Sequence, residues 1–367
     1  MKYWIYILFI TVSFTESHSR CPEYNLRTDP TDLTYSFQSK SGHFLIHYDI
    51  EDLDDDPDVD HAVNTLDENE DGVPDYVEQV AMAADSARYL LTQVMGYKPE
   101  IPDEDGFYDI YLVDLQDNYW GICHHTGGGK TYLEIRNSYS NGPVSSDYCS
   151  DTNDRMWLSV GHEFFHAIQH RYKENANSTD RFYREFTSMW FEEIFVPGCQ
   201  DFLSFTHMNS SQSLFNNPER GFSAESTQTS NKFYGYSLAL FGHYLSTIVD
   251  IKGQNDQLES TIMREVWERY EEGYPIFSAL ENTLIDYNTN FPEVWTDFMS
   301  RNMFCGEFDS MDDNDIYYHE GQSLINPLNI SYYNIDDSGP IVVNQAQIYN
   351  DRVSIFGFNA NEEMKIE

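Results

Sequence analysis

The spacing of hydrophobic residues predicts strands and one helix in the first part of the chain. Residues 43–50, 108–115 and 131–136 alternate in polarity or are rich in aromatic and β-branched side chains, as is typical of strands. Between the first two strands, apolar residues recur at helical spacing over 74–95, and Gly96 ends this helix. The first part of the chain is therefore expected to contain both helix and sheet.

Beyond residue 150 the hydrophobic spacing predicts helices. The expected spans are 154–173, 180–196, 234–250, 257–272, 275–287 and 291–304. From about residue 330 the pattern returns to short β segments, at 341–343 and 353–356. We therefore expect the α+β class, with an α+β N-terminal half that leads into a mostly helical C-terminal half.

Composition narrows the classes of function. The chain of 367 residues carries 62 Asp and Glu against 21 Lys and Arg, a formal net charge of −41. Such a polyanion repels nucleic-acid phosphates, so nucleic-acid binding is not expected. Hydrophobic residues make up 40% of the chain and aromatic residues 16%, which is too much for a disordered acidic segment. A folded protein that attracts cations is the interpretation that remains.

The N-terminus has the pattern of a secretory signal peptide. Lys2 precedes an apolar run over residues 3–14, and small residues follow it, so residues 1–19 are expected to be removed on export. The alternative is a buried N-terminal strand. The run is too short to span a bilayer, and no later segment is long enough. An extracellular protein can form disulfides, and we expect Cys123 to pair with Cys149, because they bracket one Gly-rich and Ser-rich region.

The segment His162-Glu-Phe-Phe-His166 carries the strongest chemical pattern. Residues four apart on a helix share a face, so both imidazoles can bind one metal ion, and Glu163 lies where it can reach metal-bound water. Asn153 or Asp154 is expected to cap this helix. The alternative is a helix with stabilising histidines and no metal.

A catalytic zinc site needs a third protein ligand. Glu185 lies nineteen positions after His166, on the next predicted helix. This arrangement resembles the gluzincin metallopeptidases, in which HExxH and a Glu from a second helix bind zinc. Met189 and Phe186 depart from the thermolysin and aminopeptidase branches of that group, which have Asp and Gly there.

The chain most resembles a secreted bacterial metalloprotease family that joins a calcium-type loop, an HE-aromatic-aromatic-HAIQ helix and a Trp-rich second helix. The resemblance covers most of residues 43–305 and implies a zincin-like fold of two lobes. From the pattern along the chain we expect an α+β lobe over 20–173, a helical lobe over 174–328, and a β appendage, or the start of a truncated β domain, over 329–367.

The resemblance also implies roles for individual residues. His162, His166 and Glu185 would hold Zn²⁺, and Glu163 would act as general base. Glu192 and Glu193 are not expected to be ligands. The residues expected to stabilise the oxyanion are Tyr234 and Tyr236, with His243 as a third candidate. His170 is expected at the surface or beside the ligands, and His124 and His125 either bind a second ion or lie in a polar loop.

Residues 67–78 fit the twelve-residue calcium-loop pattern. Gly72 allows the sharp turn, and the expected Ca²⁺ ligands are Asp67, Asn69, Asp71, Val73, Asp75 and Glu78. No helix is predicted before this loop, which in that respect resembles dockerin and thrombospondin type-3 loops. One structural calcium ion is expected, and an acidic turn without an ion is the alternative.

Together these patterns predict a secreted, zinc-dependent, calcium-stabilised endopeptidase that acts on proteins or peptides as a monomer. The strand over 131–136 is expected to be the edge strand that pairs with an extended substrate. The alternative is a calcium-dependent extracellular adhesion or binding module whose peptidase site has decayed.

Overall fold

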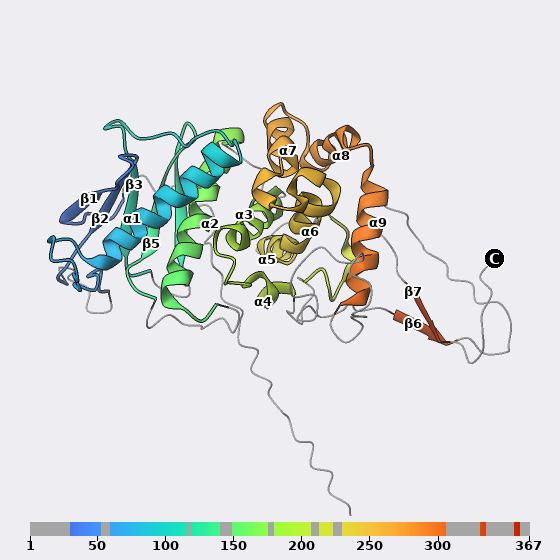
Figure 1. Ribbon diagram of the computed structural model, residues 1–367, viewed down its shortest axis with the longest axis horizontal. Coiled ribbons are helices and arrows are strands. Elements are labelled where there is room, and N and C mark those ends of the chain that lie inside the picture. The colour runs from blue at the N-terminus through green and yellow to red at the C-terminus, as the bar shows by residue number, and fades with distance from the viewer. Residues whose placement is uncertain are drawn as a thin grey trace, which may run out of the picture.

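The structure is a computed structural model of the chain. It describes residues 30–52, 59–115, 119–139, 149–174, 180–206, 213–222, 230–305, 331–334 and 356–359. In these ranges a five-stranded sheet packs against helices, and a larger group of helices continues on the side away from the sheet (Figure 1). The expected mixture of helix and sheet is confirmed. The proposed signal peptide, residues 1–19, lies outside the described residues.

The sheet has the strand order β1-β2-β3-β5-β4. Its strands are β1 (Tyr35–Gln38), β2 (Phe44–Tyr48), β3 (Tyr108–Val113), β4 (Gly121–Gly127) and β5 (Lys130–Arg136). The three central strands run parallel, whereas β1 and β4 pair antiparallel at the two edges. The hydrophobic pattern predicted β2, β3 and β5 but missed the two edge strands.

The expectation that residues 131–136 form the edge strand is wrong. These residues lie in β5, which pairs with β3 on one side and with β4 on the other. A tight turn with positive φ at Gly127, Gly128 and Gly129 folds β4 back along β5, and so β4 becomes the edge of the described sheet.

Two helices pack against each other and against the sheet: α1 (Asp75–Arg88), which continues as the π-helical segment η1 (Tyr89–Val94), and α2 (Thr152–Tyr172). Phe164 of α2 lies edge-on to Phe44 of β2 and Tyr108 of β3, with ring centroids 5.2 and 5.6 Å apart. This aromatic contact fixes which face of α2 is turned to the sheet.

Helix α2 begins earlier than expected. Asp151 caps it, and its carboxylate accepts hydrogen bonds from the backbone N–H groups of Asn153 at 2.8 Å and Asp154 at 3.2 Å. The expectation that Asn153 or Asp154 caps the helix is therefore wrong, because both already lie in its first turn.

The helical part begins with α3 (Arg181–Phe195), which packs along α2. The helices that follow are α4 (Phe202–Thr206), α5 (Ser230–Ser237), α6 (Ala239–Tyr244) with the π-helical η4 (Leu245–Val249), α7 (Ile262–Glu271), α8 (Ile276–Asp286) and α9 (Phe291–Arg301). Short 3₁₀ turns are η3 (Pro218–Arg220), η5 (Ile251–Gln254), η6 (Gln257–Glu259) and η7 (Asn302–Phe304). The helix expected over 234–250 is thus divided, and the one expected over 257–272 begins only at Ile262.

Two short strands, β6 (Ser331–Asn334) and β7 (Phe356–Asn359), pair in parallel near the C-terminus. Of the β segments expected there, 341–343 and 353–355 lie outside the described residues. Within the described part of the chain, no helix combines the length and the hydropathy that a membrane span requires.

The disulfide expected between Cys123 and Cys149 is wrong. Cys149 is bonded to Cys199 instead, with the Cα atoms 4.5 Å apart. Cys149 lies just before α2 and Cys199 just after α3, and the stacked rings of Trp157 and Phe195 show that these two helix ends lie together. Cys123 lies on β4, so sequence proximity was a poor guide to the pairing.

Candidate metal centre

The side chains of His162, His166 and Glu185 meet between α2 and α3. The two Nε2 atoms lie 3.2 Å apart, and each is 3.4 Å from Glu185 Oε2. All three side chains are buried, with at most 7% of any residue exposed. Among the described residues, this is the group of three His, Cys, Asp or Glu side chains that could hold a metal ion. The structure thus brings together the three residues that the sequence predicted as ligands.

Glycines allow the close packing around this centre. A Cβ atom at Gly121, the first residue of β4, would lie 2.6 Å from Glu163 Cγ. A Cβ atom at Gly235 in α5 would lie 2.2 Å from the carbonyl oxygen of Phe182 and 3.0 Å from Glu185 Cβ. Neither glycine can be replaced without moving these neighbours, so β4 and α5 approach the two acidic side chains closely.

Both histidines have a polar partner on the ring nitrogen that faces away from the centre. His162 Nδ1 lies 2.5 Å from a carboxylate oxygen of Glu192, and His166 Nδ1 lies 2.9 Å from the amide oxygen of Gln169. Because both partners present acceptor oxygens, both Nδ1 atoms carry a proton. In neutral rings the Nε2 lone pairs then point into the centre, as metal-binding histidines require.

The centre therefore favours positive charge. Burial acts to raise the pKa of the Glu185 carboxyl, but His166, His162 and the nearby Arg181 outweigh it, and the pKa lies well below its usual range. When the rings are neutral and each Nδ1 carries the proton, two imidazole lone pairs and this carboxylate face one another at 3.2–3.4 Å. Buried acceptors in this arrangement need a proton or a cation between them, so the donor set fits a metal ion.

Glu163 lies on α2 beside His162 but is not part of the group of three ligands. It is 2% exposed and packs against Gly121 at the start of the edge strand. The Glu163 side chain therefore lies at the start of the edge strand, from the position on α2 that follows His162.

The three candidates for oxyanion stabilisation have different surroundings. The Tyr236 ring lies 6.1 Å from the His162 ring, between centroids. The Tyr234 hydroxyl donates to the carbonyl oxygen of Gly221, and so it is engaged elsewhere. His243 Nε2 lies 2.8 Å from Glu193 Oε2. The Tyr236 ring thus lies against a residue that the sequence predicted as a ligand.

The side chains of His124, His125 and His170 have different neighbours. His124 and His125 are neighbours on β4, not in a loop: His124 lies 2.9 Å from Glu134, whereas His125 stacks on His170, with centroids 4.7 Å apart. His170 is buried, so the surface position considered for it is wrong. Burial and the Arg184 guanidinium lower the pKa of His170 well below its usual value, and it is therefore neutral at pH 7.

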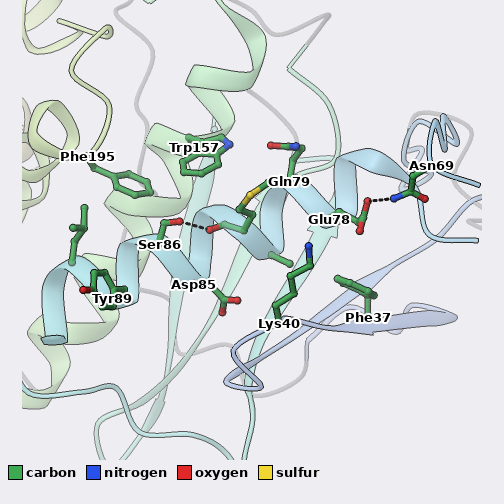
Figure 2. A pocket seen from close by; sticks show the side chains of 13 residues that line it. Phe37, Lys40, Asn69, Glu78, Gln79, Asp85, Ser86, Tyr89, Trp157 and Phe195 are labelled. Atoms are coloured by element: carbon green, nitrogen blue, oxygen red, sulfur yellow. Dashed lines mark hydrogen bonds between the residues drawn. The ribbon is translucent and has the colours of Figure 1, made fainter. Parts of the chain in front are cut away.

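The acidic loop over residues 67–78 is closed by its own side chains. Asp67 accepts from the N–H groups of Asp71 at 3.2 Å and Gly72 at 2.9 Å, and the Asn69 amide donates to Glu78 Oε2 at 3.0 Å (Figure 2). Gly72 has φ 93°, the sharp turn that the pattern requires. The structure therefore forms the expected turn, and Glu78 projects from α1 toward it.

A cavity of about 600 Å³ lies along α1, and Figure 2 shows the side chains that line it. Its lining includes Phe37, Lys40, Met82 and Trp157, and Glu78 links it to the acidic loop. None of its lining residues belongs to the group of three ligands, so it is a separate feature of the surface.

Comparison with protein-family models gives no match to this chain, and comparison with curated proteins gives no relative. The likeness to gluzincins therefore rests on the residues described above. Sequence reasoning missed two residues around the centre. Gln169 lies at helical spacing from His166, which could have indicated contact, but nothing in the sequence places Gly121 beneath Glu163.

Proposed function

We propose that the chain is a zinc-dependent endopeptidase of the gluzincin type, built on a zincin-like fold of two lobes. The observation that carries the proposal is a buried cluster in which the Nε2 atoms of His162 and His166 and Oε2 of Glu185 lie 3.2–3.4 Å from one another. Zinc–ligand bonds of about 2.0–2.1 Å in a tetrahedral site put neighbouring ligand atoms about 3.3–3.4 Å apart. The two imidazole nitrogens of this donor set also favour zinc over calcium or magnesium.

In this proposal His162, His166 and Glu185 hold the ion, and Glu192 and Gln169 orient the two rings. A bound zinc ion polarises a carbonyl group and lowers the pKa of its water to about 7. Glu163 accepts the proton of the attacking water and delivers it to the leaving amine. Because Glu163 adjoins Gly121, this transfer takes place beside the edge strand.

Strand β4 replaces β5 as the strand that aligns the substrate. It is the edge of the described sheet, so an extended peptide can add to it through backbone hydrogen bonds. Tyr236 would donate its hydroxyl hydrogen to the oxygen that becomes negative as the carbonyl is attacked. The proposal also includes export, based on the apolar N-terminal run, and one calcium ion in the loop over 67–78.

Replacing Glu163 with Gln tests the proposal. Glu163→Gln should keep the metal content of the parent but lower peptide turnover by at least roughly a hundredfold, since the amide cannot accept the proton. Metal content and cleavage of a broad peptide mixture are measured on the same samples. Turnover at the parent rate would contradict the role of Glu163.

A further inference from the structure

Gln169 is a fully buried residue that links α2 to α3 beside the metal centre. Its Nε2 lies 3.0 Å from each of three oxygens on α3: the carbonyl oxygen of Arg184 and the hydroxyls of Thr187 and Ser188. Its Oε1 lies 2.9 Å from His166 Nδ1. One amide group thus connects a ligand ring on α2 to the helix that carries Glu185.

The partners of this amide fix its orientation. A carbonyl oxygen can only accept, so the Arg184 carbonyl requires the amide nitrogen of Gln169 to face it. The Thr187 hydroxyl donates to the Tyr183 carbonyl at 3.0 Å, and so it too can accept from Gln169. The amide oxygen must therefore face His166, whose Nδ1 then carries the proton.

We propose that Gln169 is the positioning residue that fixes the tautomer and the rotation of His166. By holding the proton on Nδ1, it leaves the lone pair of Nε2 directed at His162 Nε2 and Glu185 Oε2. Because its anchors lie on α3, it also sets His166 relative to the third ligand. This inference rests on the metal centre of the proposed function.

His162 is held in a different way. Its Nδ1 lies against the Glu192 carboxylate, which is also buried. The Glu192 carboxylate is a negatively charged acceptor beside its ring, whereas the Gln169 carboxamide is a neutral acceptor that orients its ring without placing a charge beside it. The two ligand rings are therefore oriented by separate residues, and a change at Gln169 should affect His166 and leave His162 as it is.

The test is ¹⁵N NMR of the metal-free protein with labelled histidine, together with zinc affinity from competition with a chelator. In the parent, both His162 and His166 should carry the proton on Nδ1. Gln169→Met keeps the length and volume of the side chain but removes the amide. It should give His166 mixed tautomers, leave His162 unchanged, and weaken zinc binding by roughly ten- to a hundredfold.

Thr187→Val is the matched control, since it removes one of the three anchors, leaves the amide in place and, unlike a change at Ser188, removes no hydroxyl beside His166 Nδ1. It should keep the tautomer of His166 and most of the zinc affinity. A His166 Nδ1 that carries no proton in the parent would overturn the inference, and this result comes from the parent protein alone. Parent affinity in folded Gln169→Met would also overturn it. This test does not measure peptide cleavage, so its result is independent of the cleavage experiment described above. A protein that passes this test but cleaves no peptide in that experiment would disprove the proposed function alone.

Discussion

The metal centre and the acidic loop both match a sequence pattern, but they use their carboxylates differently. At the centre, Glu185 is 3% exposed, and side chains hold the ligand rings from behind. In the loop, Asp67 is half-buried and Asp71 is exposed, and both accept hydrogen bonds from backbone N–H groups of the loop itself. The centre therefore depends on tertiary contacts, whereas the loop is closed largely by its own residues.

This difference determines what an ion contributes in each region. Burying a carboxylate without a compensating charge costs several kcal/mol, so a cation at the centre removes a large penalty. In the loop, water solvates the same groups, and an ion adds only the binding energy gained by the folded state. Loss of a ligand should therefore have a large effect at the centre and a modest one in the loop.

Glu185→Ala should have the largest effect. Removing a ligand should weaken zinc binding by about a thousandfold or more, beyond the roughly ten- to hundredfold typical of an outer partner. Glu192→Ala should fall in that smaller range, because Glu192 contacts the outer nitrogen of His162. Glu193→Ala, whose carboxylate faces His243, is the control and should bind zinc as the parent does. If Glu192→Ala alone empties the site, the assignment of the third ligand is wrong.

Tyr236→Phe should have the next largest effect. It removes the hydroxyl of a ring that lies against the His162 ring, so kcat should fall by roughly ten- to a thousandfold while zinc content and melting temperature stay the same. Tyr234→Phe is the matched comparison, since that hydroxyl is bonded to Gly221, and its kcat should remain near that of the parent. The opposite order of the two variants would move the oxyanion role to Tyr234.

The two tyrosines also illustrate how much of the candidate site the sequence could predict. Spacing placed His162 and His166 on one face of a helix and predicted Glu185 on the next helix, because local helix geometry fixes both. It could not separate Tyr234 from Tyr236, because the distinction depends on the position of Gly221 and on the close approach of Gly235 to α3.

The fold was predictable to a similar extent. Periodicity identified the strands and helices whose buried residues repeat regularly, such as α2 and β3. It missed β4, whose sequence Gly121–Gly127 has no clear alternation, and with it the edge of the sheet. The disulfide partner of Cys149 was also missed, because Cys199 approaches Cys149 only where α3 returns along α2. Long-range packing decides such features.

The smallest effect is expected in the acidic loop. A ligand at a hundred times its Kd stabilises a folded protein by about 2.7 kcal/mol, so Asp71→Ala should lower the melting temperature by several degrees in millimolar calcium and leave zinc content unchanged. Glu104→Ala removes an exposed charge outside the loop and should melt like the parent. Identical melting curves of the parent with and without calcium would contradict a calcium site.

The central claim is that zinc held by His162, His166 and Glu185 is required for peptide cleavage. The most direct measurement is zinc content and cleavage of a peptide mixture, followed on one preparation through chelation and return of zinc. We predict one zinc ion per chain, loss of cleavage in step with loss of zinc, and recovery of both when zinc is returned. Full cleavage by the zinc-free protein, or no cleavage by the fully loaded protein, would contradict the claim.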